Sequence, residues 1–298
     1  MESKFMGTGV ALVTPFNADH SIDYAGLEAL LQHVAKGGID YLVASGTTGE
    51  PSTMSEKEKI AVLKFVKANN PNNLPVMYGI GGNNTAEQVE KYINFEVEVD
   101  AFLSTSPYYN RPSQAGIQKH YELIADASSK PVLVYNVPAR TGSNVTAATS
   151  IALSKHPNIM GVKEASGNLA QCIEIAGATP DDFLLISGDD ALAVPMISVG
   201  AKGLVSVVAN ALPGITTQMA NKALEGDYKA AAKSAYQLME PINLCFAEYS
   251  PSGVKYMLKA LGVCEEHVRL PLTPPSDPLK SQIDAYVASI SEHFTTTV

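Results

Sequence analysis

The sequence predicts an α/β fold, a TIM (β/α)8 barrel followed by a C-terminal helical domain. Short apolar runs alternate along the chain with segments whose apolar residues recur at helical spacing. The runs are apolar at successive positions, as in strands that are buried on both faces of a parallel sheet. Eight such runs lie within residues 1–227, which is the number and the length that this barrel requires.

The expected strands follow one another in chain order at TGVALVTPF, DYLVASGTTGE, PVMYGIGGN, AFLSTSPYYN, VLVYNVPARTG, IMGVKEASG, FLLISGDDA and GLVSVVAN. Amphipathic helices are expected between them, for example over residues 23–36, 55–69 and 85–95. Several of these segments open on a Ser, Thr or Asp, which are the residues that cap helix N-termini. The strand and helix signals therefore alternate as a barrel demands.

Residues 228–298 contain no strand-like run, and we expect three helices there, which form a separate C-terminal domain behind a catalytic barrel of residues 1–227. The last helix is expected to begin at Asp277-Pro278, because proline is favoured in the first turn of a helix. Its apolar residues recur at helical spacing and are Leu279, Ile283, Tyr286, Val287, Ile290 and Phe294. We expect this stripe to be buried on the barrel or on another subunit.

Composition excludes several classes of protein. The 298 residues carry a formal net charge of -9 and no cluster of Lys and Arg, which argues against nucleic acid or an anionic membrane surface as a partner. No apolar run approaches the length of a membrane helix, and no signal peptide opens the chain, so we expect a cytoplasmic protein. The three cysteines form no CxxC pair, and neither an HExxH motif nor a complete nucleotide-binding loop is present, so we expect no metal and no cofactor.

Unusual polar residues follow the expected strands, at the end of the barrel where TIM-barrel active sites lie. In chain order they are Gly46-Thr47-Thr48-Gly49-Glu50, Pro107-Tyr108-Tyr109-Asn110, Tyr135-Asn136 with Arg140 beyond, Lys163, Ser187-Gly188-Asp189-Asp190, and residues 205–210. Each group alone has an ordinary explanation, such as a tight turn, loop packing or a solvated surface charge. Together on one rim, they predict a single cavity.

Lys163 stands within a run that otherwise reads as a buried strand. A lysine in the mouth of an apolar barrel loses hydration, which favours its neutral amine, and that amine can attack a carbonyl to form a Schiff base. Such chemistry needs a proton carrier, for which Tyr135 on the neighbouring strand is suited, and a cradle for an anion, for which Thr47 and Thr48 are suited. Because no basic cluster follows the last two strands, the substrate is expected to be a small keto acid rather than a sugar phosphate.

The motifs GTTGE, SPYYNRPSQ, YNVPARTG, GVKEASGN and SGDD occur in this order within residues 7–274. As a set they resemble the dihydrodipicolinate synthases, also called 4-hydroxy-tetrahydrodipicolinate synthases, within the pyruvate-dependent class I aldolases. The resemblance implies condensation of pyruvate with L-aspartate 4-semialdehyde, on the way to diaminopimelate and lysine. Pyruvate then forms its Schiff base with Lys163, and its carboxylate rests on Thr48, close to Gly188 and Val205.

The resemblance also implies a proton relay, in which Tyr135 gives and takes the proton and Thr47 links it to Tyr109. In the family this last tyrosine enters the site of a neighbouring subunit, so a homo-oligomer of at least two subunits is implied, with a tetramer as the common form. Arg140 is implied to hold the carboxylate of the semialdehyde as a charge-assisted pair.

Family members that are inhibited by L-lysine bind it beside the tyrosine pair, and Asn83, Glu87 and Tyr108 match residues of that site. Glu56 and Lys59 stand where some sensitive enzymes have histidines, and these two residues can instead form an exposed pair within one helix turn. We therefore expect weak or no inhibition by L-lysine.

A second departure lies in the C-terminal part, where the family pattern Asn-Pro-x-Pro-x-Lys reads Ser250-Pro251-Ser252-Gly253-Val254-Lys255. It leaves the packing of that loop open. Two alternative functions also remain open at the level of sequence. One is a sister aldolase that cleaves N-acetylneuraminate or a 2-keto-3-deoxy sugar acid, and the other is a barrel that binds ligands without turnover.

Overall fold

A closed barrel of eight parallel strands forms the centre of the computed structural model, which describes residues 4–295. Neighbouring strands follow chain order, and the last strand pairs with the first, so the predicted fold class is confirmed. The strands are β1 (Gly7–Ala11), β2 (Tyr41–Ala44), β3 (Val76–Gly81), β4 (Ala101–Thr105), β5 (Val132–Asn136), β6 (Ile159–Glu164), β7 (Leu184–Ser187) and β8 (Gly203–Ser206).

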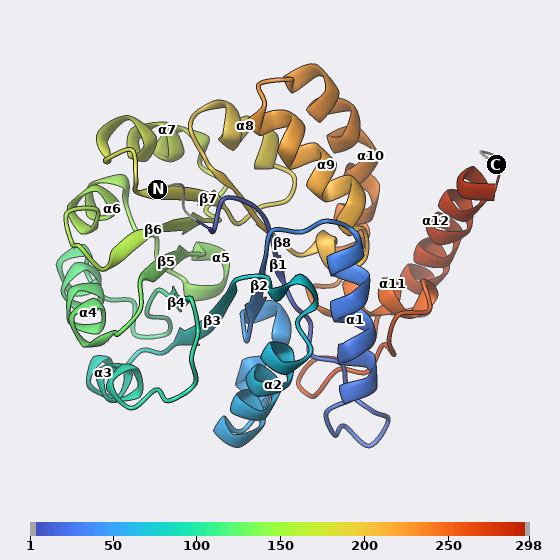
Figure 1. The fold of residues 1–298 in the computed structure, drawn as a ribbon, viewed down its shortest axis with the longest axis horizontal. Coiled ribbons are helices and arrows are strands. Elements are labelled where there is room, and N and C mark those ends of the chain that lie inside the picture. The colour runs from blue at the N-terminus through green and yellow to red at the C-terminus, as the bar shows by residue number, and fades with distance from the viewer. Residues whose placement is uncertain (1–3, 296–298) are drawn as a thin grey trace.

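Helices surround the strands, and further helices continue the chain to one side of the barrel (Figure 1). They are α1 (Tyr24–Lys36), α2 (Glu56–Ala68), α3 (Thr85–Ile93), α4 (Gln114–Ala127), α5 (Pro138–Thr141), α6 (Ala147–Leu153), α7 (Leu169–Ala178), α8 (Ala193–Ser198), α9 (Pro213–Leu224), α10 (Tyr228–Phe246), α11 (Ser252–Ala260) and α12 (Asp277–Thr295). Among these residues, none of the helices is long and apolar enough to cross a membrane.

Side-chain caps explain where several helices begin. Asp23 caps α1, and Ser113 caps α4, each by accepting a bond from a backbone N–H of the first turn. Ser55 and Glu58 form a reciprocal capping box at the start of α2. The expected helix starts at residues 23 and 55 therefore lie at the caps themselves.

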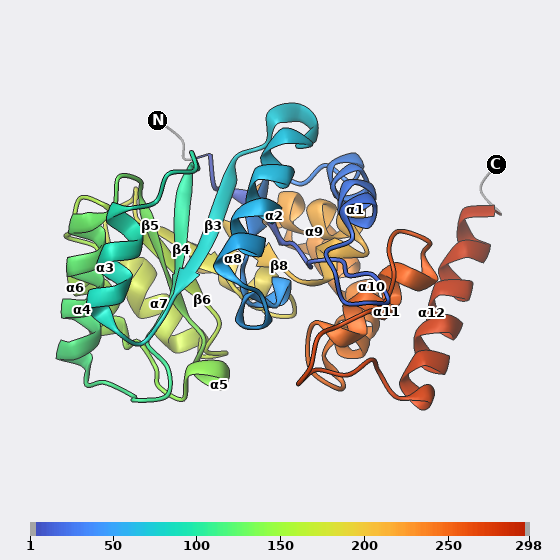
Figure 2. The same ribbon diagram turned by 90° about the horizontal axis from the view of Figure 1, so that it is seen from below.

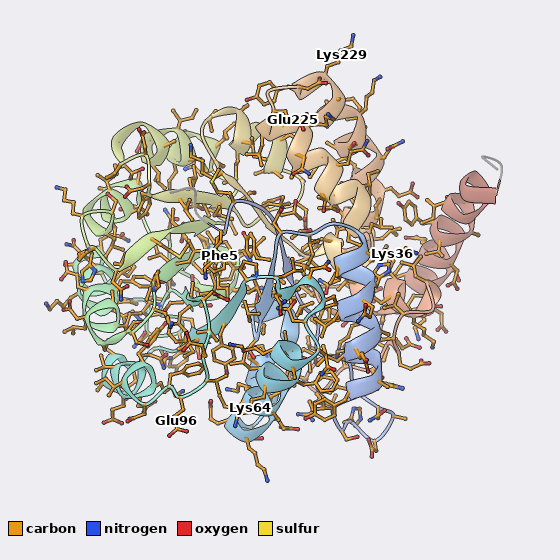
Figure 3. The ribbon with its side chains drawn as sticks, viewed as in Figure 1. Phe5, Lys36, Lys64, Glu96, Glu225 and Lys229 are labelled. Atoms are coloured by element: carbon orange, nitrogen blue, oxygen red, sulfur yellow. The ribbon has the colours of Figure 1, made fainter. Side chains whose placement is uncertain are left out.

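The barrel has an inner and an outer core. Inside it, side chains such as Val43, Met77, Leu133 and Ile186 pack together, and Phe5 meets Tyr41 edge to face at 5.3 Å where the strands begin. Phe5 accordingly lies near the centre of the strands in Figure 3, whereas Glu96 and Lys229 lie at the periphery. The outer core fills the space between strands and helices. Burial on both faces explains why the strands read as continuous apolar runs.

The eighth strand is shorter than the run GLVSVVAN predicts. It ends at Ser206, and a 3-10 turn, Val208–Asn210, follows. The buried Asp190 carboxylate accepts bonds from the backbone N–H of Val207 at 3.0 Å and of Val208 at 3.3 Å. These bonds occupy donors that a continued strand would use in its ladder, so the chain turns at the rim of the barrel.

The last helix packs differently from the expectation. α12 contacts α10 and α11, and Figure 2 shows it beyond these helices, far from the strands. Leu279, Ile283 and Val287 are buried in the single chain. This part of the stripe is thus covered by the two preceding helices rather than by the barrel, and the side chain of Phe294 lies outside the described residues. The division of the chain between residues 227 and 228 into two domains stays a prediction.

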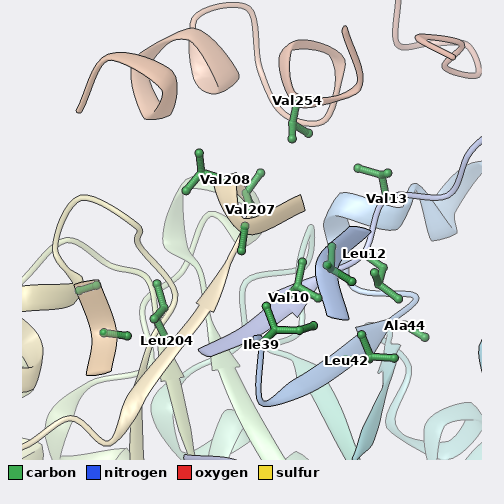
Figure 4. Packing of buried hydrophobic residues seen from close by; sticks show 14 of the residues in the cluster. Val10, Leu12, Val13, Ile39, Leu42, Ala44, Leu204, Val207, Val208 and Val254 are labelled. Atoms are coloured by element: carbon green, nitrogen blue, oxygen red, sulfur yellow. The ribbon is translucent and has the colours of Figure 1, made fainter. Parts of the chain in front are cut away.

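The C-terminal helices also pack on the rim of the barrel. α10 and α11 both contact the 3-10 turn that follows β8. In Figure 4, Val254 of α11 faces Val208 of that turn and Val13, which follows β1. All three side chains are fully buried or nearly so and belong to the outer core. This contact brings residues near position 254 close to the end of the barrel where the polar motifs lie.

Candidate active site

Lys163 and Tyr135 lie together inside the barrel. They are paired across β6 and β5, and the lysine Nζ lies 4.3 Å from the centre of the tyrosine ring. Lys163 is 4% exposed and Tyr135 is 5% exposed. The expected nucleophile and proton carrier are therefore neighbours in a largely apolar interior, which is the environment that the proposed chemistry needs.

Gly188, directly after β7, leaves room for the lysine. A Cβ atom at this position would lie 3.0 Å from Cε of Lys163 and 2.7 Å from Cβ of Ala165. Both distances are too short for carbon atoms in contact. Val205 of β8, the other expected neighbour of pyruvate, is buried and belongs to the inner core.

Thr47 and Thr48 lie on a 3-10 turn, Thr47–Gly49, that follows β2. The turn is closed by a bond from the N–H of Gly49 to the carbonyl of Gly46, and the Thr14 hydroxyl donates to the carbonyl of Gly49 at 2.7 Å. Thr48 is buried. These bonds fix the threonine pair at the rim of the barrel.

A cavity of about 470 Å³ opens beside this turn. Its wall includes Thr47, Thr105 and Arg140 at the barrel rim, and it continues outward between α2 and α3. Lys163 and Tyr135 are not among the residues that line this cavity, and they lie deeper, inside the barrel. Leu103 connects the two regions, because it lines the cavity and also packs in the inner core.

Arg140 lies on the short helix α5 and is exposed. Its Nη2 atom donates to the carbonyl of Ser250 at 3.4 Å, so the C-terminal segment contacts the arginine that lines the cavity. A guanidinium at the rim can pair with a carboxylate that enters the cavity.

Tyr108 and Tyr109 follow β4 and point in different directions. Tyr108 lines the cavity, whereas Tyr109 is 88% exposed and has a φ of 69°, in the left-handed region. An exposed Tyr109 cannot lie beside the buried Tyr135, so a single chain does not assemble the expected relay through Thr47. Its ring instead stands free to enter another molecule.

The residues that match the effector site are partly engaged with their own chain. Asn83 donates to the carbonyl of Tyr108 at 3.2 Å, and Glu87 accepts a bond from Asn84 at 2.9 Å. Lys59 donates to Glu56 at 2.7 Å, which lowers the pKa of that glutamate, as the exposed helical pair predicts. Glu56, Lys59 and Tyr108 all line the outer part of the cavity.

Sequence reasoning missed a buried ion pair behind the threonine turn. Lys255 Nζ lies 2.5 Å from Oε1 of Glu50, and both side chains are completely buried. Burial lowers the pKa of Lys255, and the Glu50 carboxylate opposes this shift. The available signals were a glutamate at the end of GTTGE and a lysine within the apolar GVKYML, but 205 residues separate the two.

The structure offers no group of three or more His, Cys, Asp or Glu side chains, within residues 4–295, that could hold a metal ion. The three cysteines are free thiols. Burial raises the pKa of Cys172 to about 11 and that of Cys264 to about 12, which makes both poor nucleophiles at neutral pH.

Comparison with known proteins identifies the family of the chain. The model of the dihydrodipicolinate synthetase family matches residues 4–290. A 4-hydroxy-tetrahydrodipicolinate synthase of Cytophaga hutchinsonii is 45% identical over 97% of this chain and 98% of its own. A crystal structure of dihydrodipicolinate synthase from Aquifex aeolicus has a TM-score of 0.92 at 34% identity and covers 96% of this chain and 98% of that one. The enzyme of Cyanidioschyzon merolae, solved with lysine bound, has a TM-score of 0.93 at 35% identity, with 97% and 99% covered.

Proposed function

The chain belongs to the dihydrodipicolinate synthetase family, and from this premise we propose how its residues carry out the reaction. It is a lyase of the class I aldolase type, which condenses pyruvate with L-aspartate 4-semialdehyde through a Schiff base to 4-hydroxy-tetrahydrodipicolinate, in the diaminopimelate and lysine pathway. The observation that supports the residue roles most directly is the buried Lys163 amine over the face of Tyr135.

Lys163 attacks the keto carbon of pyruvate, and the keto oxygen leaves as water, so that a protonated imine joins the two. The imine makes the methyl group acidic, and loss of a proton from it gives the enamine. Tyr135 carries protons to and from these atoms. The Thr48 hydroxyl and the amides of its turn receive the pyruvate carboxylate, and Gly188 and Val205 border the bound acid.

The enamine carbon then attacks the aldehyde carbon of the semialdehyde, whose carboxylate pairs with Arg140. The amino group of the new adduct displaces the lysine amine from the imine carbon, which closes the ring and regenerates free Lys163. The position of Arg140 on the cavity wall supports this role, because a carboxylate-bearing substrate needs a cation at the entrance. A polyol substrate, as in the sister aldolases, has no such need.

The enzyme is a homo-oligomer of at least two subunits, and a tetramer is the assembly that the resemblance favours. The exposure of Tyr109 in the single chain supports this proposal, because its ring completes the relay through Thr47 only in the site of a partner. Sedimentation at working concentration measures the assembly. The free thiols and the pathway are consistent with a cytoplasmic enzyme.

Trapping with borohydride tests the proposal. The protein is incubated with pyruvate and sodium borohydride, and the peptide that carries Lys163 should gain the mass of a reduced pyruvate adduct. The Lys163→Ala variant should gain none and should lose nearly all turnover. Absence of the adduct in the unmodified protein would contradict every Schiff-base mechanism, including the sister aldolases. Faster cleavage of N-acetylneuraminate than consumption of the semialdehyde would contradict the assignment of substrate alone.

A further inference from the structure

The segment from Ser250 to Lys255 contacts both sides of the barrel rim, although it belongs to the C-terminal helices. Lys255 donates to Glu50 at 2.5 Å, directly after the threonine turn. The carbonyl of Ser250 accepts the bond from Arg140, which lines the cavity. One short stretch of chain thus touches the part of the site proposed for pyruvate and the part proposed for the semialdehyde.

Glu50 is joined to the threonine turn by its backbone and to the C-terminal segment by its side chain. Its N–H donates to the carbonyl of Thr47 at 3.3 Å, and its φ of 55° lies in the left-handed region that few residues other than glycine adopt. Its second carboxylate oxygen accepts the N–H of Arg269 at 3.0 Å. The carboxylate therefore has two anchors outside the barrel.

Within the described residues, Glu50 is the carboxylate that pairs with Lys255. Its other bond is to the carbonyl of His267 at 2.8 Å, and the Phe16 ring lies 4.2 Å from the ammonium. Both side chains of the ion pair are 0% exposed, so water cannot replace either partner. The ion pair therefore connects the residue that follows the threonine turn to helix α11.

We propose that Glu50 and Lys255 are positioning residues for pyruvate, which hold Thr47 and Thr48 at the barrel rim from the C-terminal side. This inference rests on the proposed function, because it assigns the threonine turn to the pyruvate carboxylate. The departure from the family pattern at residues 250–253 leaves this lysine in place. The proposal accounts for a lysine that is fully buried far from the nucleophile.

The first test replaces both residues of the ion pair with uncharged side chains. Replacing Glu50 or Lys255 alone would leave one buried charge without its partner and should lower the stability of the protein. The double variant Glu50→Gln/Lys255→Met removes both charges and keeps a similar side-chain volume. The control is Glu266→Gln, which removes ion pairs to Lys259 and Lys280 on the same C-terminal helices without contact to the threonine turn. Thermal unfolding verifies that each variant is folded before its kinetics are measured.

In the folded double variant, the pyruvate concentration that gives half-maximal borohydride labelling of Lys163 should rise by about tenfold, with a smaller change in the KM of the semialdehyde. Glu266→Gln should lower the unfolding temperature and leave labelling unchanged. A double variant with the pyruvate dependence of the parent protein would overturn the proposal. If the parent protein itself is not labelled, the proposed function fails, which is a different result.

The second test needs no variant and so does not depend on folding. Saturating pyruvate should slow hydrogen exchange in the parent protein at residues 47–50 and also at 267–269, since binding and the order of the anchor are linked. Peptides of α12 serve as the control and should exchange at the same rate with and without pyruvate. Slowing at 47–50 without any change at 267–269 would contradict a mechanical connection through Glu50.

Discussion

Lys163 and Tyr135 occupy paired positions on neighbouring strands, and the lysine amine faces the ring of the tyrosine rather than its hydroxyl. The face of an aromatic ring attracts an amine such as that of lysine when it carries its proton, so the ring contributes to the position of the Lys163 side chain. The hydroxyl is left for proton transfer. The structure thus separates two contributions of one side chain, and a single substitution can distinguish them.

Tyr135→Phe keeps the ring and removes the hydroxyl. Borohydride labelling of Lys163 should persist at similar pyruvate concentrations, while kcat should fall by a factor of about 100 to 10,000, the range for loss of a general acid or base. Tyr135→Leu removes ring and hydroxyl together and should impair labelling as well. Equal kcat in Tyr135→Phe and the parent protein would remove the hydroxyl from the mechanism.

Gly188→Ala should reduce the reaction of Lys163 with pyruvate by about tenfold or more, because the new methyl group would lie against Cε of the lysine and Cβ of Ala165. The measurement is the rate of imine trapping as a function of pyruvate concentration. Gly177→Ala is a matched control, because a methyl group there meets nothing within 4 Å on helix α7. The control should retain activity and gain slightly in stability.

Much of the site could be predicted from the order of the strands. Once the runs are recognised as barrel strands, Lys163 and Tyr135 must lie at the same end on adjacent strands, because parallel strands point the same way. The outward direction of Tyr109 was expected only from the resemblance, since neighbouring loop residues with unusual backbone angles do not alternate as strand residues do.

Contacts between distant residues account for the rest of the difference. In the sequence, Glu50 and Lys255 each stand at the end of a separate motif. Only the tertiary packing brings the two side chains together in the interior. The same reason explains β8, whose end depends on bonds from its following turn to Asp190. The stripe of α12 was predicted correctly as apolar, but its partners depend on how α10 and α11 pack.

Arg140→Ala should raise the KM of the semialdehyde by about tenfold or more, because it removes the cation proposed for the substrate carboxylate. Pyruvate labelling of Lys163 should stay intact and serves as the internal control. Arg140→Lys should restore only part of the affinity, since a lysine cannot form the bidentate pair. Equal loss of pyruvate labelling in Arg140→Ala would show that the arginine is misassigned.

Stability at acid pH should depend on Glu58. Hydrogen bonds from Arg269 lower the pKa of this carboxyl to about 2, from an ordinary value of 4.5. A lowered pKa stabilises the folded state at pH values above 4.5, and this contribution is lost as the pH falls from 4.5 toward 2. Because the pair is partly exposed, we expect Glu58→Gln to lower the free energy of unfolding by about 1 kcal/mol at pH 6.

The difference in free energy of unfolding between Glu58→Gln and the parent protein should shrink when urea unfolding is repeated at about pH 3, where the glutamate in the unfolded chain is protonated. Glu225→Gln is the control, since its partner Lys222 forms only an exposed pair at 2.7 Å, and it should change stability by less than about 0.5 kcal/mol. If Glu58→Gln lowers the free energy of unfolding equally at pH 6 and at about pH 3, the charge of Glu58 is not the cause of the lower stability.

Inhibition by L-lysine is expected to be weak or absent. The effector would present an ammonium and a carboxylate to the outer part of the cavity, where Tyr108, Glu56 and Lys59 lie. Glu56 is already paired with Lys59 at 2.7 Å and lies 3.8 Å from Lys91, so the carboxylate of the effector would have to compete for these cations. Glu87, a match to the effector site, is engaged by Asn84.

Titration of L-lysine into the assay at saturating pyruvate measures this effect. The double variant Glu56→His/Lys59→His removes the ion pair and introduces the histidines that the family resemblance associates with sensitive enzymes. It should be inhibited at a lower L-lysine concentration than the parent protein. The variant Lys64→His, on the same helix but outside this cavity, is the control and should behave like the parent. Half-inhibition of the parent protein at submillimolar L-lysine would mean that Asn83, Glu87 and Tyr108 suffice for binding, because the Glu56–Lys59 pair would then open at little cost.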